Sequence, residues 1–405
     1  MKVLHLVGGS LNGGAARAAL TIHDGLIAAG IDSQVLTSAH GRGPHLRSLE
    51  ATSAGKAMRS LRTVLDRAVK QRLSHAEAQS GAGFSPGVFG YPVSALVGQA
   101  DILHLHWIND GGFRLPRFDA LPKGTVWTFH DLWPMTGGCH YSFDCDRFQG
   151  SCGSCPALGS RRAHDASHYL QKQKARAVGK AVRGIATSTW LAEQAQASTV
   201  FGQARVDVIP NAVDTAALTP IPRALARQAL DLDPNRRIVL TGHASKAYQK
   251  GSDLLAAAWR QLAGMRDDTD LIGFGNIDAD LAGQYHRHFG FLADLVSLRL
   301  LYAAADVFAF PSRTEAFGRT LIEAMACGTP VVGFAGSGGP DDIITEGRTG
   351  RLVPAEDTAA FAQALNNVLD GGDVWQDACR DRAVSVYAMP VVARAHIATY
   401  RDVLG

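Results

Sequence analysis

The stretch from residue 306 to residue 333 constrains the fold of this chain more than any other segment. An apolar run at 306–310 is followed by a polar loop, an apolar helical stripe and a second apolar run at 330–333. This order predicts a strand, a loop, a helix and a strand of a buried parallel sheet. The loop and the start of the helix then lie at the carboxyl end of a strand, which is the edge where open α/β sheets bind ligands.

Two carboxylates, Glu315 and Glu323, lie in this loop and helix. If the stretch between them were entirely helical, they would be separated by about 12 Å. That distance would let one acid bind a sugar and the other a ribose, on either side of a diphosphate. The predicted helix start near Gly318 and Arg319 offers unpaired N–H groups to such an anion. A glutamate pair at this spacing is common on surface helices, so the pair alone indicates nothing.

Short apolar runs recur along the whole chain, and helical patterns separate several of them. They lie at residues 3–7, 102–106, 126–130, 184–188, 206–210, 237–241, 271–275, 307–310 and 331–334. This alternation favours α/β folds with parallel, doubly wound sheets. We place a domain boundary near Arg205, which gives domains at 1–205 and 206–385 and a C-terminal segment at 386–405, with its helix at 391–404.

Composition excludes several classes of protein. The 405 residues suggest at least two domains, and 46% of them are hydrophobic, so each domain can bury a core. The formal net charge of +3 gives no reason to expect nucleic acid as a partner. Apolar runs are too short for a transmembrane helix. Residues 1–7 are typical of a first strand rather than a signal peptide, so we expect a cytoplasmic protein.

The segment Pro311–Val332 resembles the signature of the retaining GT-B glycosyltransferases of family 4. That signature is P-S-x-x-E-x-F-G-x-x-x-x-E-A-M-A-x-G-x-P-V-V, and this chain matches nearly every framed position. The resemblance implies two Rossmann-like domains, with the acceptor on 1–205, the donor mainly on 206–385 in the interdomain cleft, and a C-terminal helix that returns to the first domain. It also implies a hexosyltransferase that uses a nucleotide diphospho-sugar, retains anomeric configuration and requires no metal or other cofactor.

The resemblance assigns roles to individual residues. Glu323 would bind ribose hydroxyls, and Glu315 would contact the sugar. Lys250 would neutralise the diphosphate, because charge grows on the leaving group as the glycosidic bond breaks. His130, at the end of a predicted strand, would orient sugar hydroxyls. The remaining donor-binding positions are Gly13 and Gly14 in the first glycine loop, and Phe317, Gly318, Arg319 and Thr320 at the helix start.

The chain departs from the family pattern before Lys250. The family commonly has an arginine a few residues earlier, and this chain has Ser245 and Lys246 there. Lys246 is the candidate replacement, although a point charge does not reproduce a bidentate guanidinium.

A cysteine-rich insertion occupies residues 137–156, which we call the cysteine loop. It contains Cys139, Cys145, Cys152 and Cys155 in a C-x5-C-x6-C-x2-C pattern. In a reducing compartment this pattern favours a structural zinc site, with free thiols or a disulfide as alternatives. His140 is a further ligand candidate. A family-4 subgroup that makes exopolysaccharides of the colanic-acid type looks similar here, which implies a role in cell-surface polysaccharide assembly.

Residues 56–73 form a predicted basic helix with an apolar stripe at Met58, Leu61, Leu65 and Val69 or Leu73. One interpretation is an interfacial helix that contacts anionic lipid at the inner face of a membrane, which fits a lipid-linked acceptor. The other is an ordinary amphipathic helix that packs its stripe inward and shows a basic face to solvent.

Two other functions remain as alternatives. A GT-B nucleotide-sugar epimerase or phosphorylase would share the donor site, but neither explains the basic helix or the cysteine loop. A non-catalytic sugar-nucleotide-binding subunit would explain the missing arginine, whereas the presence of Glu315, Glu323, His130 and Lys250 argues against it.

Overall fold

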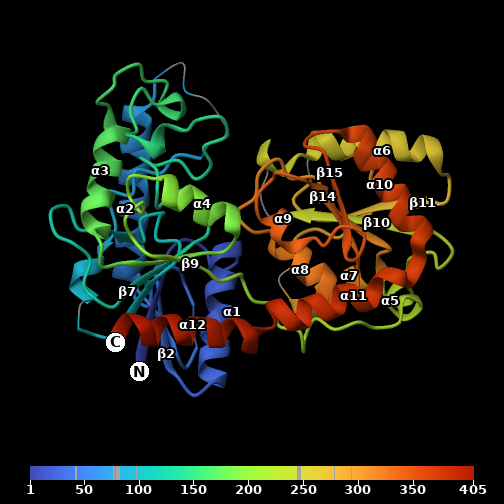
Figure 1. Ribbon diagram of the computed structural model, residues 1–405, viewed down its shortest axis with the longest axis horizontal. Helices are drawn as coiled ribbons and strands as arrows, with labels where there is room; N and C mark the ends of the chain where they lie inside the picture. Colours follow the sequence, from blue (N-terminus) through green and yellow to red (C-terminus); the bar gives the residue numbers. More distant parts are fainter. Residues whose placement is uncertain are drawn as a thin grey trace. The chain divides into compact units, whose positions relative to one another are not determined.

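The computed structural model describes the chain with the exception of residues 42, 76–77, 79–82, 97, 244–247, 278 and 293. The chain forms two compact units (Figure 1). Unit 1 contains residues 1–211 and 392–405, and unit 2 contains residues 212–391. The boundaries expected from the sequence were at 205 and 385, a few residues before each of these points.

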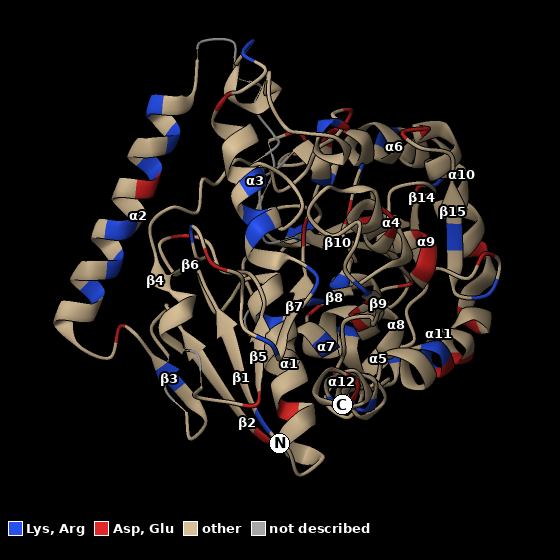
Figure 2. Cartoon of the chain, turned by 60° about the vertical axis from the view of Figure 1, so that its left-hand side comes forward, with Lys and Arg blue, Asp and Glu red and all other residues tan. Residues whose placement is uncertain are grey.

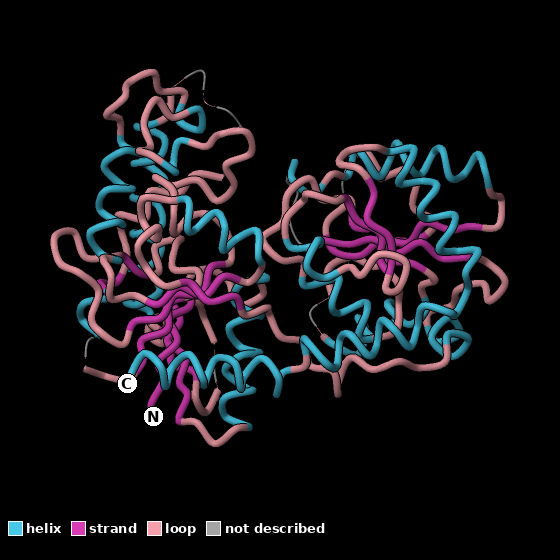
Figure 3. Tube along the Cα trace, in the orientation of Figure 1, coloured by secondary structure: helices cyan, strands magenta, loops and turns pink. Residues whose placement is uncertain are grey.

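Unit 1 is built on one parallel sheet, coloured magenta in Figure 3. In the part of the unit that the structure describes, the strand order is β3-β2-β1-β5-β7-β8-β9. The strands are β1 (Lys2–Val7), β2 (Asp32–Thr37), β3 (Leu46–Ser48), β5 (Ile102–Leu105), β7 (Thr125–Phe129), β8 (Arg183–Ala186) and β9 (Val206–Val208). The order reverses between β1 and β5, so the loops that follow these two strands flank a topological switch point.

Five longer helices belong wholly or largely to unit 1. They are α1 (Gly14–Ala28), α2 (Ser53–Leu73), α3 (Ala166–Val178), α4 (Thr189–Ala197) and α12 (Met389–Leu404). A small separate pairing joins β4 (Tyr91–Pro92) to β6 (Phe113–Arg114). Local chemistry sets several helix starts, since the side chains of Asp165 and Ser188 accept N–H groups in the first turns of α3 and α4.

Strand β9 corrects one sequence-based assignment. The run at 206–210 was expected to open the second domain, but β9 pairs with β8 in the sheet of unit 1, with Gly184 opposite Val206. Arg183 and Asp207 reinforce this pairing through an ion pair of 2.8 Å.

The C-terminal helix α12 completes the core of unit 1, as the resemblance implied. Tyr400 is fully buried, and its hydroxyl lies 2.7 Å from Nδ1 of His104 on β5. Asp402 forms ion pairs with Arg183 and Arg205. The end of the chain therefore packs against strands formed by its first half.

Unit 2 contains a second parallel sheet, with the order β12-β11-β10-β13-β14-β15 in its described part. The strands are β10 (Arg237–His243), β11 (Thr269–Gly275), β12 (Arg287–His288), β13 (Val307–Phe310), β14 (Val331–Phe334) and β15 (Gly350–Val353). The order reverses between β10 and β13, so a second switch point lies there.

The helices of unit 2 bury its apolar residues against this sheet. They are α5 (Arg223–Ala229), α6 (Ser252–Met265), α7 (Leu295–Ala304), α8 (Arg319–Ala326), α9 (Gly339–Ile343), α10 (Thr358–Gly371) and α11 (Gln376–Arg382). Strands β13 and β14 are buried along their whole length, which explains their continuous apolar sequence. The α/β fold with parallel sheets predicted from the sequence is thus confirmed.

Helix α2 of unit 1 faces its apolar stripe toward solvent. Met58, Leu61 and Leu65 are 48%, 52% and 37% exposed, whereas the single acid of the helix, Asp66, is buried. Asp66 accepts backbone N–H groups from residues 87–89 at 2.9–3.3 Å, so it fixes which side of the helix packs inward. Lys and Arg residues lie along much of the same helix (Figure 2). The interpretation of an inward-packed stripe is therefore wrong for these three residues.

Among the helices that the structure describes, none combines the length and apolar content needed to cross a membrane.

Candidate functional site

The switch point of unit 2 brings together residues that are far apart in sequence. The single 3-10 turn Tyr248–Lys250 follows β10, and the loop that contains Glu315 follows β13, the neighbouring strand. Lys250 Nζ lies 2.5 Å from Glu315 Oε2. The structure thus places a cation and a carboxylate in contact at the carboxyl edge of the sheet, where a ligand is expected.

Glu315 is fixed on its backbone as well as on its side chain. Its N–H donates to the carbonyl of Ser337 at 2.7 Å, and its own carbonyl accepts the N–H of Gly339 at 2.9 Å. The glycine-rich turn after β14 therefore runs beside the Glu315 loop. A Cβ at Gly339 would lie 2.3 Å from the backbone of Phe317, so only glycine permits this approach.

The loops that carry Lys250 and Glu315 are also locked to each other. Gly251 has φ of +64°, and a Cβ there would lie 2.0 Å from the carbonyl oxygen of Pro311. Arg313 donates its N–H to the carbonyl of Gln249 at 2.8 Å, and its guanidinium stacks 4.0 Å from the ring centre of Tyr248. The Lys250–Glu315 pair consequently rests on a rigid backbone.

Helix α8 carries the second carboxylate. Glu323 is 5% exposed; its Oε2 accepts the Tyr302 hydroxyl at 3.1 Å and its Oε1 accepts Arg319 Nη2 at 2.9 Å. Burial, and then the negative charge of Glu323, raise the pKa of Tyr302 well above its usual value, so the phenol stays protonated and donates.

The start of α8 is open to an anion. Its N-cap is Gly318, with φ of +98°, and no side chain caps the helix. Arg319 and Thr320 are half-buried, whereas Phe317 is buried. Nη1 of Arg319 is buried and has no hydrogen-bond partner among the described residues. A helix start and an unpaired guanidinium nitrogen are both suited to phosphate.

Lys246, the candidate replacement for the family's arginine, lies outside the described residues, as does the rest of 244–247.

In unit 1, the glycine loop joins β1 to α1. Gly8 donates to the carbonyl of Trp107 at 2.6 Å, and a Cβ at Gly8 would lie 2.8 Å from the carbonyl oxygen of Asn109. Gly13 is the N-cap of α1 and Gly14 its first residue, again without a side-chain cap. Gly8 is therefore the position where a neighbouring backbone comes too close for a side chain. A Cβ at Gly14 would meet open space.

His130 ends β7 at the other side of this switch point, where it joins a row of imidazoles that the sequence analysis missed. Its Nε2 lies 3.1 Å from Nδ1 of His106, whose Nε2 lies 3.0 Å from Nδ1 of His5. His104 binds Thr128 and Tyr400 at 2.7 Å each. The signal was available, because His104 and His106 alternate with apolar residues and so share one face of the strand.

Burial is the main reason that these rings are neutral. It lowers the pKa of His5, His104 and His106 well below the usual value, and neighbouring histidines lower it further. His396 of α12 lies beside His104 with a pKa of about 3, again chiefly because of burial. Neither ring nitrogen of His396 has a hydrogen-bond partner in the described part of the chain.

Asp131, the residue after His130, anchors its surroundings. Burial alone would raise its pKa, but contact with His140 lowers the pKa below its ordinary value. Its Oδ2 lies 2.7 Å from His140 Nδ1 and accepts Trp107 Nε1 at 3.0 Å. His140 Nε2 lies 2.9 Å from Ser85 Oγ, so both of its ring nitrogens are occupied and it is no longer a candidate metal ligand.

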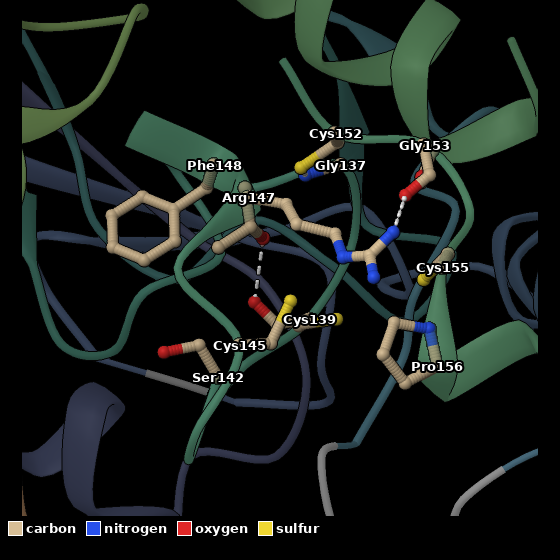
Figure 4. Close-up of a pocket in the computed structure, with 12 residues that line it drawn as sticks. Gly137, Cys139, Ser142, Cys145, Arg147, Phe148, Cys152, Gly153, Cys155 and Pro156 are labelled. Carbon is tan, nitrogen blue, oxygen red and sulfur yellow. Dashed lines mark hydrogen bonds between the residues drawn. The ribbon is translucent and has the colours of Figure 1, made fainter. Parts of the chain in front are cut away.

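The cysteine loop brings its four cysteines, Cys139, Cys145, Cys152 and Cys155, to one pocket (Figure 4). No donor-site candidate lines that pocket.

Two family models match the chain. One, described as Glycosyltransferase Family 4, matches residues 12–217, and the other, described as Glycosyl transferases group 1, matches residues 235–371.

Curated relatives include D-inositol 3-phosphate glycosyltransferases. The protein of Mycobacterium sp. (strain KMS) is 35% identical over 208 residues, which cover 48% of this chain and 46% of that relative. The protein of Mycolicibacterium gilvum (strain PYR-GCK) is 30% identical over 304 residues, which cover 70% of this chain and 62% of that relative. Each match thus spans less than two thirds of the relative's own length.

Solved structures with the same fold include sucrose-phosphate synthase from Thermosynechococcus elongatus, with a TM-score of 0.67, 20% identity and 99% of both chains covered. Anabaena Alr3699/HepE in complex with UDP-glucose has a TM-score of 0.62 at 18% identity, covering 99% of this chain and 100% of that one. At these identities the likeness shows the GT-B fold. With the family models, it shows that the chain belongs to glycosyltransferase family 4.

Proposed function

We propose that the protein transfers a sugar from a nucleotide diphospho-sugar to a saccharide acceptor with retention of anomeric configuration. The observation that carries this proposal is the contact between Lys250 and Glu315 beside the open start of α8. A cation, helix-end amides and the unpaired Nη1 of Arg319 are suited to a diphosphate, and the flanking carboxylates are suited to hydroxyls. The binding of UDP-glucose by Anabaena Alr3699/HepE supports a donor of this class.

In the proposed step, the acceptor oxygen attacks the anomeric carbon from the face that the diphosphate leaves. The bond from the anomeric carbon to the phosphate oxygen breaks with its electron pair, and that oxygen takes the acceptor's proton. Lys250 and the α8 amides stabilise the charge on the leaving group. Neither glutamate serves as nucleophile, because Glu315 is paired with Lys250 and Glu323 with Tyr302 and Arg319. His130 orients sugar hydroxyls.

The step as proposed needs no metal, since Lys250 and the helix end supply the positive charge.

Thermal shift and calorimetry with UDP, GDP, ADP and their sugar conjugates test donor binding. A nucleotide at about 100 times its Kd should stabilise the protein by about 2.7 kcal/mol. Binding should be lost in Lys250→Ala and Glu323→Ala but kept in Arg351→Ala, which breaks an exposed ion pair in the same unit. The absence of any nucleotide response in the wild type would overturn the proposal.

The stereochemistry can be followed without knowing the acceptor. Slow hydrolysis of the bound donor, monitored by NMR, should release a sugar whose first-formed anomer matches the donor. An inverted anomer would contradict retention. Conversion of the donor sugar to its epimer, or turnover that depends on inorganic phosphate, would replace the transferase with an epimerase or a phosphorylase.

We further propose that the acceptor is lipid-linked, in cell-surface polysaccharide synthesis, and that α2 contacts the membrane. The exposed row Met58, Leu61, Val64 and Leu65 lies on a helix rich in Lys and Arg, a combination suited to an anionic bilayer. The protein should float with phosphatidylglycerol vesicles and not with phosphatidylcholine vesicles. Leu61→Glu should abolish flotation, whereas Val374→Glu, at a 78% exposed site in unit 2, should not. Equal flotation of both variants would refute the contact.

A further inference from the structure

The cysteine loop has little regular structure of its own. Between β7 and α3 the described chain forms two single 3-10 turns, Arg147–Gln149 and Pro156–Leu158, and one antiparallel bridge from Cys139 to Phe84; the rest is turns, bends and irregular chain. Structureless segments of this length are uncommon inside compact domains unless something holds them. Figure 4 shows the four cysteines around one pocket. Cys139 and Cys145 come from the first half of the loop, and Cys152 and Cys155 from its second half.

Helix α3 fixes the backbone of two of these cysteines. The N–H of Cys152 donates to Gln171 Oε1 at 2.7 Å, and the N–H of Cys155 donates to Asp165 Oδ2 at 2.9 Å. The Gln171 amide also donates to the carbonyl of Phe148 at 2.6 Å. The C-x2-C pair is therefore positioned before any ligand binds, which lowers the entropy cost of binding.

A backbone N–H is directed at the sulfur of Cys152. The N–H of Gly137 donates to Cys152 Sγ at 3.2 Å. The N–H of Leu158 donates to the carbonyl of Cys155 at 3.2 Å, and the Cys155 side chain contacts that of Cys139. A donor such as the Gly137 N–H stabilises a thiolate and is typical of the shell around metal-bound sulfur.

A buried lysine borders the cluster. Lys174 of α3 is 3% exposed, and its Nζ donates to the carbonyls of Trp133 and Thr136 at 2.5 and 2.9 Å. Thr136 also lines the cysteine pocket, so these hydrogen bonds fix the chain that enters the cysteine loop against α3.

Histidines do not compete for this role. In the described part of the chain, the group whose ligand atoms already lie within 4.8 Å of one another is His5, His104 and His106. Both ring nitrogens of His104 and His106 are occupied by hydrogen bonds. The cysteine sulfur atoms share a pocket at wider spacing, so a bound ion would draw them inward.

We propose that Cys139, Cys145, Cys152 and Cys155 bind one zinc ion that pins the cysteine loop to α3. Each thiol that ligates the ion releases its proton to solvent, and no group is oxidised or reduced. Four sulfur ligands close the coordination shell, so the ion is structural and takes no part in sugar transfer. The proposal stands on the cysteine loop alone, and it holds whether or not the proposed donor chemistry is correct.

The test uses the full-length protein purified under reducing conditions without chelator. Elemental analysis should find stoichiometric zinc. Replacement by Co²⁺ should give the intense visible bands of a tetrahedral site together with sulfur-to-cobalt charge transfer. Zinc should be lost in Cys152→Ser and reduced in Cys145→Ser, and it should remain in the control variants Cys327→Ser and Cys379→Ser, because those buried thiols lie outside the pocket.

The wild-type measurements decide the matter even if a variant fails to fold. A protein without zinc whose four cysteines all react with iodoacetamide in the native state would overturn the proposal in favour of free thiols. A metal-free protein with a Cys139–Cys155 cross-link by peptide mass spectrometry would overturn it in favour of a disulfide.

Discussion

The ammonium of Lys250 lies 2.5 Å from the carboxylate of Glu315, and both side chains are largely buried, at 18% and 12% exposure. The two residues follow adjacent strands, β10 and β13, so the sheet itself sets their approach. Because Glu315 holds the ammonium of Lys250, the cation is fixed beside the start of α8 and need not be ordered when an anion binds.

Breaking this pair on one side should cost both stability and affinity. In Lys250→Met, Glu315 is left as a largely buried carboxylate without its cation, so the free energy of unfolding should fall by about 1–3 kcal/mol. Urea denaturation measures the loss, and calorimetry measures the accompanying loss of nucleoside diphosphate binding. Arg351→Ala, which breaks the exposed pair with Glu346, should change stability by about 0.5 kcal/mol or less. Equal effects of the two variants would show that the contact is unimportant.

The Tyr302 hydroxyl should matter through Glu323. Tyr302→Phe removes a donor to a buried carboxylate and leaves the ring packing intact, so stability should fall by about 1 kcal/mol. If Glu323 binds the nucleotide, its Kd should rise several-fold, while hydrolysis of saturating donor keeps its rate. Glu323→Gln in the same assay should weaken nucleotide binding more. If Tyr302→Phe binds the nucleotide with the wild-type Kd, the Tyr302 hydroxyl makes no contribution to donor binding.

His106 should act as a positioning residue for His130. His106→Phe keeps a ring in the core and removes the nitrogen that contacts His130, so kcat should fall by about tenfold, equivalent to about 1.4 kcal/mol. The KM for donor should change little, because the donor-binding candidates of unit 2 are untouched. Tyr400→Phe is the matched control, since it removes a partner of His104 without altering the His106–His130 contact. If both variants have similar kinetics and differ from the wild type only in stability, the histidine row serves core packing and does not position His130.

Acid should destabilise unit 1 through its buried histidines. Because burial lowers their pKa values in the folded protein, the unfolded chain binds more protons below about pH 6.5, and stability is lost as the pH falls below that value. His396, with a pKa of about 3, alone contributes up to about 1.4 kcal/mol per pH unit across the window from 6.5 to 3.

His396→Leu provides the check. Its unpaired ring nitrogens make an apolar replacement neutral or stabilising, so denaturant unfolding at pH 5 should show a gain that shrinks by pH 8. His40→Gln, at an exposed position, should leave the pH dependence unchanged. A pH-independent effect of His396→Leu would contradict the linkage.

Sequence patterns predicted the fold well, because strands that are buried on both faces have continuous apolar sequences. They could not assign β9 to a sheet, because the sequence of a short apolar strand does not indicate which sheet it joins. The ion pair that ties β9 to β8 joins Arg183 and Asp207, which are distant in sequence. Helical periodicity located the apolar stripe of α2 but not its direction, which depends on Asp66 and the N–H groups of residues 87–89. Glu315, Glu323 and Lys250 are predicted from the sequence as site residues. The structure adds the residues that contact the two glutamates, namely Tyr302 and the turn after β14.

The packing of α12 has a consequence for the order of events during synthesis. Tyr400 and His396 fill the core of unit 1 beside His104, yet they are translated after all of unit 2. At typical rates of about 5–20 residues per second, the first sheet therefore waits tens of seconds for its last helix. Unit 2 is contiguous in sequence, so its last residue is translated before His396 and Tyr400, the side chains that complete the core of unit 1.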